Sequence, residues 1–344
     1  MTHIRIIIVG GGPAGSTCGY ILRKNGIDCV IVDKNEFPRD KLCGGGLTPK
    51  AHILLDKIFE GLKYDYHCAN TMDVYAHNKS YCTFNLNPEI RTVLRSEFDT
   101  QLLEEYMKLD GRVITGRVVS IEEKNGKVFL TLDDGQKLSC DILIGADGAV
   151  SIVRRYLQPN YKKGIVCVEK TVKGKSRSGI QVIFDKRFDN GYMYVFPNKD
   201  GNIVGYGHKG TSVEEFKDLM KEYDIADNEK VKGAYIPMLE KIKYQFRKNI
   251  LLIGDAGGYA DSMTGEGIYY AIKTGENAAR SIIENKDFHE LSRSVIKEVR
   301  IIRLMSITFY FRPIHKLFLW MCTKPALSRR INRAVNKYLK WEKS

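Results

Sequence analysis

A glycine-rich turn near the amino terminus constrains this chain more than any other feature. The apolar residues 3–9 lead into Gly10-Gly11-Gly12-Pro13-Ala14-Gly15, a G-x-G-x-x-G pattern, and Asp33 ends the next apolar run. Alone the pattern can be no more than a glycine-rich turn, but this order predicts the strand–turn–helix–strand unit that binds dinucleotides. Gly12 would let a pyrophosphate approach the backbone at the positive end of the helix, and Asp33 would accept a ribose hydroxyl.

The composition is that of an ordinary globular protein, with 43% hydrophobic and 28% charged residues in 344. A chain of this length predicts two lobes. Its eight cysteines show no C-x-x-C spacing, which argues against a metal site and a disulfide framework and favours a reducing compartment. The first apolar run is too short for a signal peptide, so we expect a cytoplasmic protein.

Hydrophobic periodicity predicts an α/β fold in which the first lobe is discontinuous. Its strands are expected near residues 4, 29, 142 and 251, with a helix over about 48–59, a second helix from Arg95, and strands over 112–115, 118–124 and 127–132. Residues 64–94 and 165–210 are predicted to be β-rich, and about 212–223 helical. The expected domains are a cofactor domain (1–63, 95–160 and 246–285), a substrate domain (64–94 and 161–245) and a basic helical region (286–344).

Further motifs resemble those of a known family. The glycine turn at 10–15, Gly145-Ala146-Asp147-Gly148 and Gly254-Asp255-Ala256 resemble the FAD-binding fold of the aromatic hydroxylase type. More narrowly, Lys41-x-Cys43-Gly44-Gly45, Tyr194-x-Phe196-Pro197 and the segment 261–271 resemble the geranylgeranyl reductase family of flavoproteins. The resemblance covers about residues 1–285. It implies a Rossmann-like FAD-binding domain of the glutathione-reductase type, with an inserted β-rich substrate domain and a C-terminal helical tail outside the resemblance.

The resemblance and the glycine turns together predict where FAD binds. Asp255 would accept a ribityl hydroxyl, Gly265 and Gly267 would let the backbone pass against the ring, and the helix from about Gly267 would stabilise the reduced flavin anion. Arg95 would pair with the pyrophosphate or be a solvated surface arginine, and Asp147 would bind the cofactor or only brace its turn. Ser262 departs from the family, where proline commonly follows this aspartate. The predicted cofactor contacts are Gly10, Gly12, Pro13, Ala14, Gly15, Asp33, Lys34, Lys41, Gly44, Gly45, Arg95, Val118, Asp147, Asp255, Gly265, Gly267 and Ile268.

One cysteine and a group of aromatic residues are the candidates for chemistry and substrate binding. The thiol of Cys43, in the glycine-rich loop, would donate a proton, gate the loop or simply fill space; we predict the catalytic role. Lys41 would lower the pKa of this thiol or be a solvated loop lysine, and it also counts among the predicted cofactor contacts. Tyr192, Tyr194 and Phe196, at alternate positions of one strand, and the adjacent Pro197 would line an apolar substrate tunnel or belong to the core.

The positive charge of the chain is concentrated in its tail. Residues 300–344 contain 11 Lys/Arg and one acid, a net +10 of the total +13. Residues 301–322 are apolar and aromatic but interrupted by charges, and a helix from Pro325 would carry apolar and basic faces. This pattern predicts that residues 300–344 bind an anionic membrane surface through a helix lying in its interface, the alternative being a helix packed on the body. Nucleic acid is not expected as a partner, because no recognition fold accompanies the charge.

The resemblance implies an FAD-dependent reductase that saturates double bonds of an isoprenoid chain on a lipid, diphosphate or quinone. One alternative is an aromatic monooxygenase that uses NAD(P)H and oxygen; the absence of W-x-W-x-I-P argues against a halogenase. Another is a non-catalytic, membrane-associated flavin-binding protein. No second dinucleotide unit and no cysteine cluster is present, so we expect an external electron donor, NAD(P)H or a redox protein. The expected location is peripheral to the inner face of the cell membrane.

Overall fold

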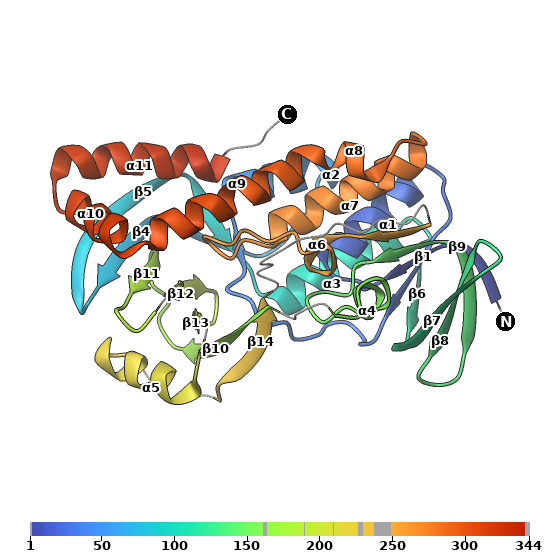
Figure 1. Ribbon diagram of the computed structural model, residues 1–344, viewed down its shortest axis with the longest axis horizontal. Coiled ribbons are helices and arrows are strands. Elements are labelled where there is room, and N and C mark those ends of the chain that lie inside the picture. The colour runs from blue at the N-terminus through green and yellow to red at the C-terminus, as the bar shows by residue number, and fades with distance from the viewer. Residues whose placement is uncertain are drawn as a thin grey trace.

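The computed structural model describes residues 2–160, 164–188, 190–208, 210–225, 230–236 and 249–340. Two sheets lie at opposite ends of an elongated molecule, and helices from the C-terminal region run along both (Figure 1). The predicted α/β architecture, with a Rossmann-like domain, an inserted β-rich part and a helical tail, is confirmed. The boundaries between domains remain a prediction.

The first sheet has the strand order β6-β2-β1-β9-β8-β7, and β15 also pairs with β9. Strands β6, β2, β1, β9 and β15 are parallel, whereas β7, β8 and β9 form an antiparallel meander. The strands are β1 (Thr2–Val9), β2 (Val30–Asp33), β6 (Arg112–Thr115), β7 (Val118–Lys124), β8 (Lys127–Leu132), β9 (Lys137–Gly145) and β15 (Ile250–Leu252). The strands predicted at 112–115, 118–124 and 127–132 are confirmed.

Alternation along β1 explains how this sheet is covered, because successive side chains of a strand point to opposite faces. Ile6 and Ile8 pack in a core with helices α1 (Pro13–Lys24), α2 (Pro49–Ile58), α3 (Arg95–Met107) and α7 (Ile268–Ile283). Ile7 and Val9 pack in the opposite core with the meander and α4 (Ile152–Leu157). The carboxyl ends of the parallel strands therefore meet the start of α1 at one edge, as a dinucleotide fold requires.

The second sheet has the order β14-β10-β13-β12-β11-β4-β5-β3. Helix α5 (Val213–Glu222) covers one part of it with Phe216, Leu219 and Met220. The strands are β3 (Gly46–Leu47), β4 (His67–Ala76), β5 (Lys79–Thr92), β10 (Ile165–Lys173), β11 (Ile180–Phe184), β12 (Tyr192–Asn198), β13 (Gly201–Gly207) and β14 (Lys232–Ile236). Strand β3 lies in the loop that follows β2, so this loop joins the second sheet to the first lobe.

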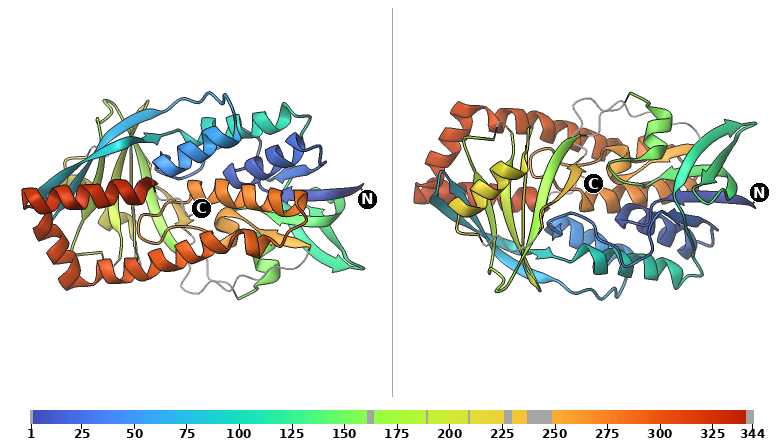
Figure 2. Two further views of the ribbon diagram at one scale, coloured as in Figure 1. Left: turned by 90° about the horizontal axis from the view of Figure 1, so that it is seen from above. Right: turned by 90° about the horizontal axis from the view of Figure 1, so that it is seen from below.

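The C-terminal helices close over both parts. After α6 (Gly254–Gly257) and α8 (Phe288–Leu291), helix α9 (Arg293–Tyr310) runs from the first lobe to the second, α10 (Arg312–Cys322) turns at the far end, and α11 (Pro325–Lys340) returns (Figure 2). Ile331 and Val335 of α11 pack against the β4–β5 hairpin with Leu319 of α10. Helix α11 therefore matches the alternative of a helix packed on the body. Among the described helices, none has the length and apolarity to cross a membrane.

Candidate functional site

The nucleotide turn between β1 and α1 has the geometry that the glycine pattern predicts. Gly10 has φ +109°, and a Cβ there would lie 2.4 Å from the Ala146 carbonyl oxygen, so the first glycine is required by the neighbouring turn. A Cβ on Gly15 would lie 1.9 Å from the Gly10 oxygen. No side chain caps the start of α1, where Pro13 and Ala14 are buried, and the Asp33 carboxylate accepts the Gly11 amide at 2.7 Å. The free amino end of α1 is therefore available to an anion.

Beside this turn, two arginines form ion pairs with the same buried carboxylate. Arg95 donates two hydrogen bonds of 2.8 Å to Asp99, whose side chain is 0% exposed, and Arg39 lies 3.1 Å from the same carboxylate. The nearest atom to a Cβ built on Gly12 is the Arg39 guanidinium, at 3.3 Å. Arg95 is buried, so the alternative of a solvated surface arginine is wrong. A pyrophosphate at Gly12 would meet positive charge from Arg39 as well as the helix.

The segment from Gly254 to Ile268 leaves space where a flat ring system would lie. A Cβ on Gly265, which has φ +71°, would meet no atom within 4 Å, and one on Gly267 would meet only the Asp255 carboxylate, at 3.3 Å. That carboxylate has no hydrogen-bond partner among the described residues. Gly267 begins α7 without a side-chain cap, and Ile268 is its first residue. An open cradle, a free acceptor and a free helix start fit the ribityl chain and isoalloxazine of FAD.

Four other predicted cofactor contacts do not point a free side chain into this site. The Asp147 carboxylate accepts Ser151 Oγ at 2.5 Å and the Ile152 amide at 2.7 Å, so it holds the start of α4, which matches the bracing alternative. The Val118 side chain is buried in the core of the meander, which leaves only its backbone for a contact. Lys34 is exposed after Asp33, and Lys41 is partly exposed. For these four, cofactor contact stays a prediction.

The glycine-rich loop at residues 43–46 contacts strand β12 close to the segment from Gly254 to Ile268. A Cβ on Gly44 would lie 2.6 Å from the Phe196 ring and 3.2 Å from the Tyr194 ring, so only glycine permits this approach. Gly45, with φ +70°, faces the Val93 carbonyl in the same way. Tyr192 donates a hydrogen bond to the Thr264 carbonyl. The structure thus brings the predicted substrate residues of β12 to the predicted flavin loop.

The aromatic rings of β12 form a stripe on one face of the strand. Ring centroids of Tyr192 and Tyr194 are 6.2 Å apart, and those of Tyr194 and Phe196 are 5.1 Å apart. The alternating residues Met193 and Val195 fill the core on the other face under α5. Pro197 is buried, and its carbonyl accepts Thr92 Oγ1. The stripe therefore lies on the face opposite α5. There Tyr192 packs with the β4–β5 hairpin and the C-terminal helices, and Phe196 packs beside Leu339 of α11. Contact of the stripe with a substrate stays a prediction.

A buried acid lies behind the loop. Glu169 of β10 accepts the Cys43 amide at 3.1 Å through Oε1 and the Tyr194 hydroxyl at 2.7 Å through Oε2. Burial raises the pKa of Glu169 above its ordinary value, although both hydrogen bonds, Lys41 and Arg95 act in the opposite direction. Burial, followed by the Glu169 charge, raises the pKa of Tyr194 well above 10. We define Glu169, Tyr194 and Cys43 as the loop acid cluster.

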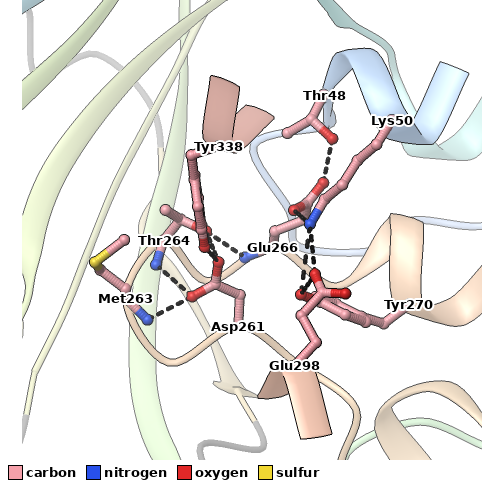
Figure 3. Close-up of polar contacts among 9 residues, drawn as sticks. All are labelled: Thr48, Lys50, Asp261, Met263, Thr264, Glu266, Tyr270, Glu298 and Tyr338. Atoms are coloured by element: carbon pink, nitrogen blue, oxygen red, sulfur yellow. Dashed lines mark hydrogen bonds and ion pairs between the residues drawn. The ribbon is translucent and has the colours of Figure 1, made fainter. Parts of the chain in front are cut away.

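A second buried cluster lies at the base of the segment 261–267 (Figure 3). Lys50 Nζ, in a residue only 3% exposed, lies 3.0 Å from Glu266 and 3.3 Å from Glu298, and Tyr270 donates to Glu298 at 2.8 Å. Burial lowers the pKa of Lys50, but the Glu266 and Glu298 carboxylates outweigh it and the net shift is upward, so the ammonium stays charged. We define these residues with Asp261 and Tyr338 as the lysine cluster.

Asp261 connects this cluster to the tail. Its carboxylate accepts the amides of Met263 at 2.6 Å and Thr264 at 3.1 Å, the Thr264 hydroxyl at 2.8 Å, and the hydroxyl of Tyr338 from α11 (Figure 3). The turn that carries Gly265 and Gly267 is therefore fixed from inside by Asp261. The tail, which lies outside the motifs, contributes one of the hydrogen bonds.

Sequence reasoning missed several residues of this site. Asp99 had a local signal, because it stands four residues after Arg95 on a predicted helix and an acid there faces a base. Glu169 and Glu298 had none, since their partners lie between 25 and 248 residues away along the chain. Arg39 lies in a loop whose path the sequence does not specify.

Comparison with known proteins agrees with this geometry. The family described as FAD binding domain matches residues 3–174. An uncharacterized protein of Methanosarcina barkeri is 30% identical over 336 residues, covering 90% of this chain and 83% of its own. Geranylgeranyl diphosphate reductase of Rhodobacter capsulatus is 28% identical, with 80% and 73% covered, and menaquinone reductase of Mycobacterium tuberculosis is 26% identical, with 85% and 79% covered.

Two solved structures show the same fold. A geranylgeranyl bacteriochlorophyll reductase-like protein of Thermoplasma acidophilum has a TM-score of 0.69 at 19% identity, with 99% of this chain and 92% of that chain covered. A flavin-dependent brominase has a TM-score of 0.72 at 18% identity, with 97% and 94% covered. At such identities the likeness concerns the fold alone. The match to the FAD binding domain family establishes FAD as the cofactor.

Proposed function

The chain belongs to the geranylgeranyl reductase family of FAD-dependent oxidoreductases, and on that premise we propose that it saturates carbon–carbon double bonds of an isoprenoid chain. The chain would be carried by a lipid, a diphosphate or a quinone. Relatives named geranylgeranyl diphosphate reductase and menaquinone reductase support this substrate class. The observation that carries the proposal is the meeting of the β12 aromatic stripe, the flavin loop and a buried acid at one place.

The residues described above would bind the cofactor. The start of α1, Arg39 and Arg95 would hold the pyrophosphate, Asp33 a ribose hydroxyl and Asp255 the ribityl chain. Gly265 and Gly267 would face the ring. FAD, when bound and reduced, supplies the hydride equivalent, and an external donor, NAD(P)H or a redox protein, restores the reduced form.

The β12 stripe positions the substrate. An isolated alkene has little polarity, so reaction depends on holding it against the hydride source in a place without water. The rings of Tyr192, Tyr194 and Phe196 offer an apolar surface at the loop, and an isoprenoid chain would lie along them. The same rings exclude water from the double bond.

The loop acid cluster supplies the proton. Saturation breaks one π bond and adds a hydride to one carbon and a proton to the other. Because its pKa is raised, Glu169 holds a proton at Oε2 more readily than an exposed carboxyl does. When Oε2 is protonated it would donate to the Tyr194 oxygen, which reverses the hydrogen bond described above and frees the Tyr194 hydrogen for the second carbon. Tyr194 would then take the Glu169 proton and leave a Glu169 carboxylate.

Cys43 is the second candidate for the proton donor. Its Sγ accepts the Gly45 amide at 3.4 Å, so the thiol has a structural partner in its own loop. Cys43→Ala separates the two roles. If Tyr194 donates, turnover should fall by less than about tenfold, whereas loss of the acid itself would reach the 10²–10⁴ typical of general acids.

The test follows the flavin spectrum without oxygen. Holoprotein is reduced anaerobically and mixed with geranylgeranyl lipids; reoxidation that depends on the lipid is the expected result. Reoxidation that needs oxygen and an aromatic compound would instead support a monooxygenase. A flavin that neither NAD(P)H, reduced redox proteins nor dithionite can reduce would support a non-catalytic role. Because the substrate belongs to the bilayer, we propose that the enzyme works at the inner face of the cell membrane.

A further inference from the structure

An exposed apolar strip follows the bend between α9 and α10. It consists of Leu304, Ile307, Phe311, Ile314, Leu317 and Trp320, whose exposed fractions range from 38% to 67%. The spacing of three or four residues places them along one side of the two helices. With Met305, they are seven of the fifteen large hydrophobic residues that are exposed in the described part of the chain. Such a concentration within 17 residues marks an interaction surface.

We propose that this strip, which we name the docking strip, lies in the surface of an anionic lipid bilayer. Residues 299–340 contain no acid, and exposed bases flank the strip, among them Arg312, Lys316 and Lys324. The Lys324 ammonium lies 5.6 Å from the centre of the Trp320 ring. An apolar face with a basic margin and a tryptophan is typical of interfacial helices.

The charges favour a bilayer over a second copy of the chain. A symmetric dimer brings the same surface of both subunits together, so the basic margin would face itself. That contact would bury apolar side chains at the cost of like-charge repulsion, whereas anionic headgroups would neutralise the same bases. The sequence predicted membrane contact for residues 300–344 as a whole. Because Ile331 and Val335 of the helix from Pro325 are packed on the body, the docking strip narrows that contact to residues 304–320.

The opposite side of α9 touches the functional site. Ser306 Oγ donates to the Ser262 carbonyl at 3.1 Å, and the Tyr310 hydroxyl donates to the Met263 carbonyl at 3.4 Å. A lipid at the docking strip would therefore be about one helix diameter, roughly 10 Å, from the segment 261–267. This explanation of the position rests on the proposed function, but the surface itself is testable without a substrate.

The experiment measures vesicle binding by the FAD-loaded protein. Wild type should sediment with phosphatidylcholine vesicles that contain phosphatidylglycerol, less with pure phosphatidylcholine, and less again at high salt. The double variant Ile307→Gln/Leu317→Gln should bind at least tenfold more weakly, and Arg312→Glu/Lys316→Glu should lose the preference for phosphatidylglycerol. The matched control Met107→Gln/Val119→Gln changes exposed apolar residues elsewhere and should bind as wild type does.

A spectroscopic measurement locates the contact. In Trp341→Phe, Trp320 is the only tryptophan, and its emission should shift to the blue when anionic vesicles are added. No shift, or unchanged binding by Ile307→Gln/Leu317→Gln, would overturn the proposal. A stable dimer that this double variant converts to monomer would also overturn it, in favour of a protein interface.

Failure of the proposed function would look different. The Ile307→Gln/Leu317→Gln variant should reduce a geranylgeranyl lipid in detergent as fast as wild type, because neither residue touches the functional site. If wild type binds vesicles but reduces no isoprenoid, the docking strip stands and the proposed reaction fails.

Discussion

The two buried acidic clusters that flank the proposed flavin site differ in what surrounds their carboxylates. In the lysine cluster, a buried ammonium lies within 3.3 Å of both Glu266 and Glu298. In the loop acid cluster, the direct hydrogen-bond partners of Glu169 are a backbone amide and a tyrosine hydroxyl, both neutral. Burial raises the pKa of Glu266 as well as that of Glu169, but beside Glu266 the Lys50 ammonium opposes the shift through a direct ion pair, which Glu169 lacks. Under the proposed function, similar residues serve stability in the lysine cluster and chemistry in the loop acid cluster.

Removing the cation should have the largest effect on the molecule. Lys50→Met leaves Glu266 and Glu298 buried without a counter-charge, and we expect a loss of about 3–5 kcal/mol in the free energy of unfolding. Urea unfolding of the FAD-loaded protein measures it. Lys108→Met, which breaks an exposed pair with Glu105, is the control and should leave the midpoint unchanged. An unchanged midpoint for Lys50→Met would show that the buried ammonium does not stabilise the lysine cluster, and the proposed difference between the two clusters would fail.

Removing the proposed proton store should affect turnover and not folding. Glu169→Gln keeps both hydrogen-bond positions but carries no transferable proton, so single-turnover reduction should slow by about 10²-fold. FAD affinity and the unfolding midpoint at neutral pH should change little. Glu214→Gln, on the exposed side of α5, serves as the control. A Glu169→Gln variant with wild-type turnover would show that another group supplies the proton.

The raised pKa of Glu169 gives this comparison a pH dependence with a defined sign. Its folded pKa lies above the unfolded value of about 4.3, so its contribution to stability is complete below that value and is lost as pH rises through the folded pKa. Turnover should fall over the same rise. Glu169→Gln should lack this step and become the more stable protein at alkaline pH. Parallel stability curves for the two proteins would argue that Glu169 is charged throughout.

The tail contact should make the smallest difference. Tyr338→Phe removes one of the four hydrogen bonds to the Asp261 carboxylate, and we expect a loss of about 1–2 kcal/mol in the free energy of unfolding. Thermal unfolding of the FAD-loaded protein measures it. FAD release should quicken slightly, since Asp261 fixes the turn of Gly265 and Gly267. A loss as large as that of Lys50→Met would mean that the tail, and not the lysine, supports this segment.

The parts that the sequence predicted are those whose reason is local. The turn at 10–15, the helix from Arg95 and the strand–helix unit around Asp255 each depend on neighbours within a few residues, through periodicity or glycine conformation. The two acidic clusters depend on packing between distant segments, such as Thr48 with Glu266 and Cys43 with Glu169. The tail shows the same limit, because its amphipathic pattern is compatible with both a bilayer and a sheet. Only the fold decides that α11 covers β5 while the docking strip remains exposed.

The most direct test of the proposed reaction is the mass of the product. Anaerobically reduced holoprotein is incubated with one equivalent of a geranylgeranyl lipid, and the lipid is extracted and weighed by mass spectrometry. The proposed reaction predicts a gain of two hydrogens per reduced bond, at a rate that falls in Glu169→Gln. A lipid of unchanged mass after the flavin has been fully reduced, across lipid, diphosphate and quinone carriers, would contradict it.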